Sequence, residues 1–253
     1  MPTSRSAAPS HRGPAEASDT TPQARNGRSV ALRLAGGAVG IWAVIALVGL
    51  LITRVVSPDA PPSWDARVID WFVAHRTPTM NTATHIGSSI SDTYTAIIVT
   101  IVVVLLLRWR LGRWFESWIV VAAITGELLV FVAITATVHR ARPAVERLDP
   151  APPTSSFPSG HTAAAIALYG CIAVLLLVLW PGVASRLAAC VLFAIPFVVG
   201  FSRMYRGMHF PSDVLFGAIG GALWLAVVTT TLLPLRHNRG THARSVRGPA
   251  AAR

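Results

Sequence analysis

The sequence predicts an all-α, polytopic membrane protein whose six transmembrane helices form a bundle. The chain has 253 residues, of which 53% are hydrophobic and only 13% are charged, and its mean hydropathy is +0.54. This balance is typical of multi-pass membrane proteins and unlike that of a soluble domain. The apolar residues also form separate runs near the length of ~20 residues that a helix needs to cross the hydrocarbon core.

The six predicted spans follow one another along the chain. They cover residues 34–53, 93–107, 118–138, 162–180, 187–201 and 214–235. The second and fifth are short, and the fifth contains Pro196. We expect residues 29–236 to form one membrane domain, between a disordered cytoplasmic tail (1–28) and a basic cytoplasmic tail (237–253). The first tail has no apolar stretch, so it does not read as a signal peptide.

Charge predicts the orientation of these spans. An even number of spans puts both termini on one side, and that side holds 14 arginines and three acidic residues, against eight arginines and seven acidic residues on the other. The positive-inside rule therefore places both termini in the cytoplasm of a cell-membrane protein. The net charge of +11 then suits anionic lipid headgroups and does not indicate a nucleic-acid partner.

The segment between the first two spans, residues 57–92, carries a helical pattern of its own. Its apolar and aromatic residues recur at helical spacing, at Trp64, Val68, Trp71, Phe72 and His75, with charged residues between them at Asp65, Arg67 and Asp70. This pattern fits an amphipathic helix lying in the outer membrane interface. A packed extracellular loop is the alternative.

Three polar motifs stand at the borders of the apolar runs, all on the predicted outer side. Arg142-Pro143 follows the third span, and Pro158-Ser159-Gly160-His161 opens the fourth. Ser202-Arg203 closes the fifth span, and His209 and Asp213 precede the sixth. Each motif alone is weak, because such residues are also ordinary caps, turns or topology anchors. Their shared side and their positions at helix ends predict a single phosphate-handling site at the outer membrane-water border.

The residue types suggest how that site would work. Asp213, four residues after His209, is placed to accept the proton of one imidazole nitrogen, which leaves the other nitrogen free to attack phosphorus. His161 is placed to protonate the leaving oxygen as a general acid. We therefore expect His209, His161 and Asp213 to be catalytic.

Four further residues are expected to bind the phosphate. The planar guanidinium of Arg203 matches phosphate oxygens, and Arg142 adds positive charge where the transition state spreads negative charge. Gly160 lets the backbone approach the phosphate closely, and the hydroxyl of Ser159 adds a donor.

These motifs resemble those of the type 2 phosphatidic acid phosphatase family, which shares its fold with bacterial acid phosphatases and vanadium haloperoxidases. The second motif matches completely at residues 158–161, and the third matches completely at residues 202–213. The first matches only at Arg142-Pro143, because Thr135 stands where the family has a lysine. The chain has no lysine at all, and we hypothesise that Arg140 supplies the missing charge.

The resemblance implies a phosphatase in which His209 becomes a phospho-histidine, with Asp213 orienting it and no metal or cofactor required. The expected substrate is a lipid phosphate or a polyprenyl diphosphate such as undecaprenyl diphosphate. Two alternatives are a lipid phosphotransferase of the same fold and a non-enzymatic membrane transporter. Transport sites usually lie near the bilayer midplane, whereas these motifs lie at helix ends. Glu127, inside the third span, is expected to form a structural hydrogen bond or to serve a proton relay.

Overall fold

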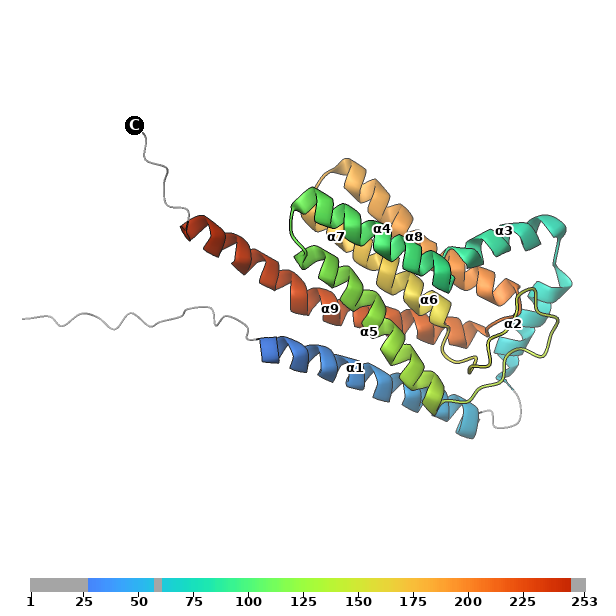
Figure 1. The fold of residues 1–253 in the computed structure, drawn as a ribbon. Coiled ribbons are helices and arrows are strands. Elements are labelled where there is room, and N and C mark those ends of the chain that lie inside the picture. Colours follow the sequence, from blue (N-terminus) through green and yellow to red (C-terminus); the bar gives the residue numbers. More distant parts are fainter. Residues whose placement is uncertain (1–26, 57–60, 247–253) are drawn as a thin grey trace, which may run out of the picture.

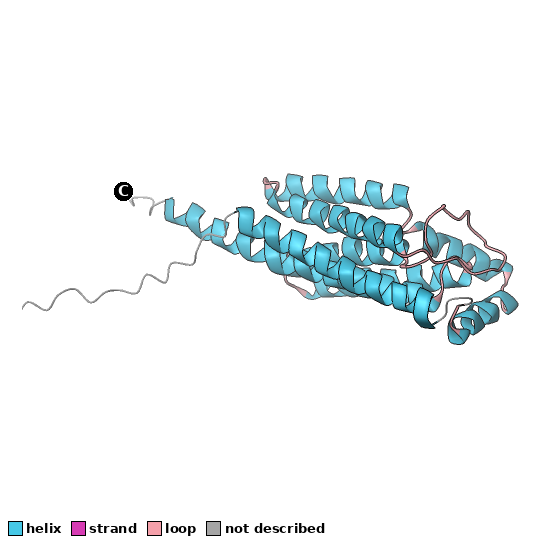
Figure 2. Cartoon of the chain, turned by 90° about the horizontal axis from the view of Figure 1, so that it is seen from below, coloured by secondary structure: helices cyan, strands magenta, loops and turns pink. Residues whose placement is uncertain are grey.

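The computed structural model describes residues 27–56 and 61–246, with side chains described up to residue 235. Every regular element in these ranges is helical (Figure 2), which confirms the all-α prediction. Of the two predicted tails, residues 1–26 and 247–253 lie outside the described residues.

Six helical segments are long and apolar enough to span a membrane, as the sequence predicts. The first joins α1 (Gly27–Leu50) to a π-helical stretch, η1 (Leu51–Val56). The next two are α4 (Thr93–Leu111) and α5 (Phe115–Thr137). The fourth is built from α6 (Gly160–Ala165), the π-helical η2 (Ile166–Gly170) and α7 (Cys171–Leu179). The last two are α8 (Val183–Tyr205) and α9 (Pro211–Val246).

The two spans that look short in the sequence are full-length helices. α4 continues to Leu111 through Arg108 and Arg110, and α8 runs to Tyr205 through Pro196. An apolar run underestimates a helix where arginines extend it, because their long side chains reach the interface while the backbone remains helical. The chain is therefore a multi-pass membrane protein with six complete spans.

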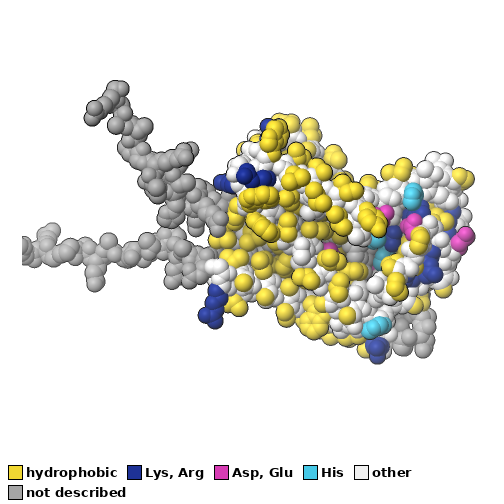
Figure 3. All heavy atoms as spheres, in the orientation of Figure 1, with side chains coloured by type: hydrophobic (Ala, Val, Ile, Leu, Met, Phe, Trp, Pro, Cys, Tyr) yellow, Lys and Arg dark blue, Asp and Glu magenta, His cyan; other side chains and the backbone are white. Residues whose placement is uncertain are grey.

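The outer surface of the bundle is apolar along its length. Figure 3 shows hydrophobic side chains covering the central part of the molecule, with charged side chains at its two ends. α4 packs chiefly against α5, so residues such as Ile97, Ile101 and Leu105 remain exposed in the structure. Large exposed apolar surfaces of this kind are suited to lipid and not to water.

The centre of the bundle is formed by α5 and α9 together with α6–α7. α9 packs against α1, α5 and α6. The indole Nε1 of Trp224 in α9 donates to the carbonyl of Ala123 in α5, at 2.9 Å. A Cβ at Gly126 would lie 1.9 Å from the ring of Trp224, so the two helices pack this closely only because residue 126 has no side chain.

The segment between the first two spans contains two helices, α2 (Ser63–Ala74) and α3 (Pro78–Ser89). The helical interpretation of this segment is thus confirmed, but one of its expected polar spacers is placed differently. Trp64 and Trp71 are exposed, whereas Phe72 is buried, and Asp65, expected among the polar spacers, is fully buried. Asp65 is buried because it pairs with an arginine from a distant loop, a contact that helical periodicity does not reveal.

The helices of the bundle connect at two opposite ends, which are named here by the segments that they contain. The motif end, as we call it, comprises α2, α3, residues 138–159 and residues 206–210, and the tail end comprises the turns at residues 112–114 and 180–182 (Figure 1). Both ends of the described chain lie at the tail end (Figure 1), as an even number of spans requires.

Candidate active site

Backbone hydrogen bonds join the three motifs at the motif end. The N–H of Ser159 donates to the carbonyl of Asp213 at 2.9 Å, and the N–H of Ser156 donates to the carbonyl of Arg140, also at 2.9 Å. A Cβ at Gly217, one turn after Asp213, would lie 2.5 Å from the carbonyl oxygen of Ser159. The first turns of α9 therefore lie directly against the start of α6, and the loop before α6 is tied to the segment after α5.

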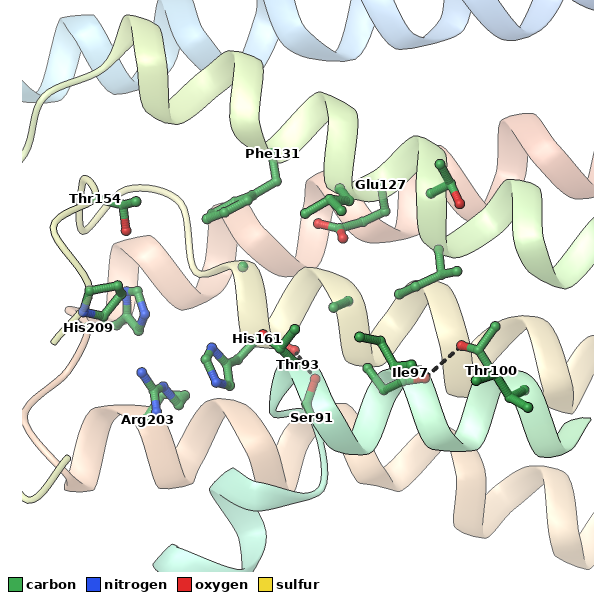
Figure 4. A pocket seen from close by; sticks show the side chains of 18 of the residues that line it. Ser91, Thr93, Ile97, Thr100, Glu127, Phe131, Thr154, His161, Arg203 and His209 are labelled. Atoms are coloured by element: carbon green, nitrogen blue, oxygen red, sulfur yellow. Dashed lines mark hydrogen bonds between the residues drawn. The ribbon is translucent and has the colours of Figure 1, made fainter. Parts of the chain in front are cut away.

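A cavity of about 500 Å³ opens at this junction. Its polar wall includes Arg142, Gly160, His161, Arg203 and His209, which come from all three motifs. Figure 4 shows His161, Arg203 and His209 gathered at one end of this cavity. The predicted convergence of the motifs on one pocket is thus present in the structure.

His209 lies in the short connection between α8 and α9 and is 3% exposed. Its Nδ1 lies 2.8 Å from the carbonyl oxygen of Ser156, an acceptor, and its Nε2 lies 3.3 Å from Nη1 of Arg142, a donor. These partners require a neutral imidazole with its proton on Nδ1 and a lone pair on Nε2. Burial lowers the pKa of His209 to about 4, so this neutral form persists at neutral pH.

Asp213 does not contact His209 in the way that the sequence suggests. Its Oδ2 lies 3.8 Å from Nδ1 of His209, too far for a hydrogen bond. Oδ2 instead accepts from the hydroxyl of Ser156 at 2.5 Å and from the N–H of Phe210 at 2.8 Å. The carbonyl of Ser156 therefore orients the imidazole, and Asp213 contacts the hydroxyl of the same serine.

Arg140 does not line the cavity. Its Nη1 donates to Oδ1 of Asp213 at 2.5 Å and to the hydroxyl of Ser212 at 2.7 Å, while Nη2 donates to Oδ2 of Asp65 at 2.7 Å. The guanidinium also lies 4.6 Å from the centre of the Phe210 ring. The hypothesis that Arg140 supplies charge to the phosphate is wrong in this structure, because two buried carboxylates hold its guanidinium.

Thr135, at the position of the family lysine, does not supply a substitute contact. Its hydroxyl donates to the carbonyl of Val132 within α5, at 3.1 Å, and the residue is not part of the cavity wall. The cationic groups that face the cavity are Arg142 and Arg203.

Arg142 and Arg203 each present a donor that lacks a partner. Nη1 of Arg142 donates to the carbonyl of Met208 at 2.9 Å, and Nη1 of Arg203 donates to the hydroxyl of Ser88 at 2.9 Å. The Nε atoms of these two arginines are the only fully buried side-chain nitrogens or oxygens of the described residues that have no hydrogen-bond partner. Both arginines line the cavity, and their guanidinium groups together suit an anion with several acceptor oxygens.

Asp149 orients Arg203. Nη1 of Arg203 lies 3.2 Å from Oδ2 of Asp149, and Arg206 reaches the same carboxylate through Nε at 2.7 Å and Nη2 at 2.6 Å. Burial alone would raise the pKa of Asp149, but the hydrogen bond and charge of Arg206 hold it below its usual value. The sequence pattern does not single out Asp149, because it lies in an irregular loop.

His161, the second residue of α6, is held by an aspartate that the motifs do not include. Its Nε2 lies 2.9 Å from Oδ1 of Asp92, the residue directly before α4. The hydrogen bond to His161 is the main cause that lowers the pKa of Asp92, so the carboxylate is ionised at neutral pH. The sequence signal available for Asp92 is its position at a helix start, which more often indicates a cap.

The two residues before His161 behave differently. Gly160 lines the cavity, and a Cβ there would lie 2.8 Å from the ring of Phe131. Ser159 is fully buried, and its hydroxyl pairs with that of Thr162 at 3.0 Å. Of the seven predicted site residues, the cavity wall contains five, and Ser159 and Asp213 lie behind it.

The described residues contain no group of three His, Cys, Asp or Glu side chains placed to hold a metal ion. The charged residues in the polar wall of the cavity are the arginines named above, which suit an anion.

Comparisons with known proteins agree with this geometry. The model of the PAP2 superfamily matches residues 115–236. No curated protein matches the chain. Among solved structures, a transmembrane PAP2-type phosphatidylglycerolphosphate phosphatase from Bacillus subtilis is similar, with a TM-score of 0.66 and 21% identity over 79% of this chain and 95% of that one. LpxE from Aquifex aeolicus is also similar, with a TM-score of 0.51 and 23% identity over 66% of this chain and 93% of that one. At these identities the two structures show a shared fold.

Proposed function

We propose that this membrane protein, whose residues 115–236 match the model of the PAP2 superfamily, is a lipid phosphatase that works through a covalent intermediate on His209. The observation that carries the proposal is that Arg142 and Arg203 line the same cavity. They share a cavity with a buried imidazole whose Nε2 bears a lone pair. A phosphoryl group held by two arginines beside such a nitrogen is in position for attack.

The first chemical step forms a bond between Nε2 of His209 and phosphorus. The bond from phosphorus to the lipid oxygen breaks, and that oxygen takes a proton from His161. A protonated His161 would keep its Nε2–H on Asp92 and offer its Nδ1–H to the leaving oxygen. The carbonyl of Ser156 and the nearby charge of Asp213 stabilise the positive charge that develops on the ring of His209.

The second step releases inorganic phosphate. A water molecule attacks the phosphorus of the phospho-histidine and gives a proton to His161, and the nitrogen–phosphorus bond breaks. Arg142 and Arg203 stabilise the negative charge on the phosphoryl oxygens in both steps. The chain's own residues thus account for each proton, and the proposed mechanism uses no metal or cofactor.

The membrane setting supports a lipid substrate, either a lipid monophosphate or a polyprenyl diphosphate. The cavity volume lies within the range of small-molecule sites, and its wall continues from the polar end into apolar residues of α4 and α5. The distribution of arginines supports cytoplasmic termini and an outer-facing site. One of the similar structures is a phosphatidylglycerolphosphate phosphatase, which agrees with hydrolysis of a lipid phosphate.

The test is phosphate release by the purified protein from a panel of lipid phosphates, with a chelator present. We expect release by the wild type and a loss of at least ~10³-fold in His209→Ala, as for removal of a catalytic nucleophile. Brief incubation with radiolabelled substrate should trap an acid-labile phosphoprotein that is absent from His209→Ala. The matched control is His139→Ala, an exposed histidine at the same end of the bundle, which should retain wild-type activity.

Three results would contradict the proposal. A wild-type enzyme that releases no phosphate from any lipid phosphate would exclude the hydrolase, and transfer of the phosphoryl group to a second lipid would indicate a phosphotransferase. Full activity in His209→Ala would exclude this nucleophile.

A further inference from the structure

The cavity continues from the phosphate-binding wall into the membrane-spanning part of the bundle. Beyond His161 it is lined mostly by apolar side chains of α4 and α5, including Ile97, Ile101, Ile124 and Leu128. A lipid whose phosphate lies between Arg142 and Arg203 would place the part nearest its headgroup in this region. The side chains of this wall would therefore contact such a substrate just beyond its phosphate.

Glu127 is the one acidic residue in this wall. It is 5% exposed, and its carboxyl group makes no hydrogen bond or ion pair with any described residue. Figure 4 shows the side chain leaving α5 toward the cavity. A hydrogen bond to a neighbouring helix, one of the two roles expected from the sequence, is therefore absent among the described residues.

The depth of Glu127 can be set from the packing of α5. Phe131 lies against Gly160, next to His161, and Glu127 is one helical turn, about 6 Å, deeper in the membrane than Phe131. This is the depth of the first few bonds of a lipid beyond its phosphate. In a glycerolipid or an N-acylated lipid, this region holds ester or amide carbonyls. In a polyprenyl phosphate it holds only hydrocarbon.

An unpaired carboxyl group at this depth in the bundle costs free energy unless a ligand forms a hydrogen bond with it. An ionised carboxylate without a counter-charge is strongly disfavoured in apolar surroundings, and a neutral carboxyl group still costs energy without a hydrogen-bond partner. A neutral carboxylic acid has one O–H donor, which suits a carbonyl oxygen. A hydrocarbon chain would leave this donor unpaired.

We infer that Glu127 is a specificity-determining residue that hydrogen-bonds to an ester or amide carbonyl of the substrate and so selects acylated lipid phosphates over polyprenyl phosphates. This inference rests on the proposed phosphatase function and narrows its substrate class. It gives Glu127 a role in binding, separate from the steps at phosphorus.

The experiment compares three substrates in the same detergent micelles, with phosphate release as the readout. These are a diacylglycerol phosphate, its dialkyl ether analogue of equal chain length, and a polyprenyl monophosphate. The ether analogue keeps the phosphate, the glycerol and the chains but lacks the carbonyls. We expect the wild type to prefer the ester over the ether by roughly tenfold in kcat/KM, as for one hydrogen bond whose loss leaves a buried group unpaired. The polyprenyl compound should be no better than the ether.

Variants of Glu127 should change the preference for the ester over the ether without blocking the two steps at phosphorus. Glu127→Leu should bring the ester-to-ether ratio to within about twofold of one while retaining activity on the ether, since the donor is gone. Glu127→Gln, which keeps a donor, should retain most of the preference. The control is Leu129→Ala, a change on the exposed face of the same helix, outside the cavity wall; it should leave the ratio unchanged.

The outcomes separate this inference from the proposed function. No phosphate release from any substrate would contradict the phosphatase itself. Release with equal kcat/KM for ester and ether in the wild type would overturn the role of Glu127 alone, whether or not the variants fold. An ester preference that survives in folded Glu127→Leu would also overturn it.

Discussion

The motif end and the membrane-embedded part of the same bundle handle polar groups in opposite ways. In the membrane-embedded part, threonine hydroxyl groups such as those of Thr100 and Thr229 bond within their own helix, to the carbonyls of Ala96 and Leu225, each at 2.7 Å. At the motif end, buried polar side chains bond between distant segments, as Arg140 does to Asp65 and Asp213. The first pattern lets a helix cross lipid, and the second fixes a site.

This difference explains why the predicted site residues lie at the motif end. A helix that pairs its hydroxyl groups internally has no donor left for a ligand, whereas helix ends and loops bring cationic groups together without that constraint. Arg142 and Arg203 retain unpartnered Nε atoms there. Glu127 is the exception, a carboxyl group within a span that faces the cavity without a partner.

Removing Arg140 should cause the largest loss of stability. Arg140→Ala leaves the buried carboxylates of Asp65 and Asp213 without their cation, and breaking a buried pair in this way typically costs about 3–5 kcal/mol. Val228→Ala, a fully buried position of α9, should cost only about 0.5–3 kcal/mol. Thermal unfolding in detergent measures both, with the exposed Arg67 of α2 changed to alanine as the control. An Arg140→Ala protein of wild-type stability that binds substrate poorly would instead favour a direct role at the phosphate.

Arg142 should affect activity more than stability. Its Nε is free and its side chain is half-buried, so Arg142→Ala should lower kcat/KM by about 10²–10³-fold, as for loss of one charge-stabilising donor. Arg142→Lys should recover only part, because an ammonium group cannot replace the planar fork. Steady-state kinetics is the measurement, with the exposed Arg147 of the same loop as the alanine control. An equal loss in both variants would show a general charge effect.

Asp92 is a positioning residue for His161. We expect Asp92→Asn to lower kcat by roughly 10–100-fold, less than the ~10²–10⁴-fold contributed by the general acid itself. The alkaline limb of the pH profile should move to lower pH, because the charge of Asp92 favours the protonated imidazole. Asp70→Asn, an exposed aspartate at the same end, is the control. A drop in rate without any movement of the profile would assign Asp92 a purely structural role.

Protonation of His209 should have the smallest effect on activity and stability near neutral pH. Burial lowers its pKa from 6.5 to about 4, so the neutral nucleophile should persist down to about pH 4 and be lost below it. The unfolded chain takes up a proton first, and stability should therefore fall as the pH drops from about 6.5 to 4. The ring signals of His209 in NMR spectra, assigned by their loss in His209→Ala, report the titration directly. A midpoint near 6.5 would show that the ring is hydrated.

The sequence by itself determined the six spans, the helical segment before the second span, and five residues of the cavity wall. Hydrophobic runs and residues at helix borders are local features, and the length of a run sets how far it reaches across a membrane. Arg142, Gly160, His161, Arg203 and His209 follow from such features, because helix borders on one side of a membrane meet at one level.

The tertiary structure decided how these residues are held. It showed that Ser156 orients His209, that Asp92 and Asp149 hold His161 and Arg203, and that Arg140 pairs with Asp65 and Asp213. Arg140 and Arg142 are two residues apart in one irregular segment, yet the first is buried against carboxylates and the second faces the cavity. The physical reason is that such contacts depend on separations of a few ångströms between groups 50 to 75 positions apart, as with Ser156 and His209 or Asp65 and Arg140, which no local periodicity encodes.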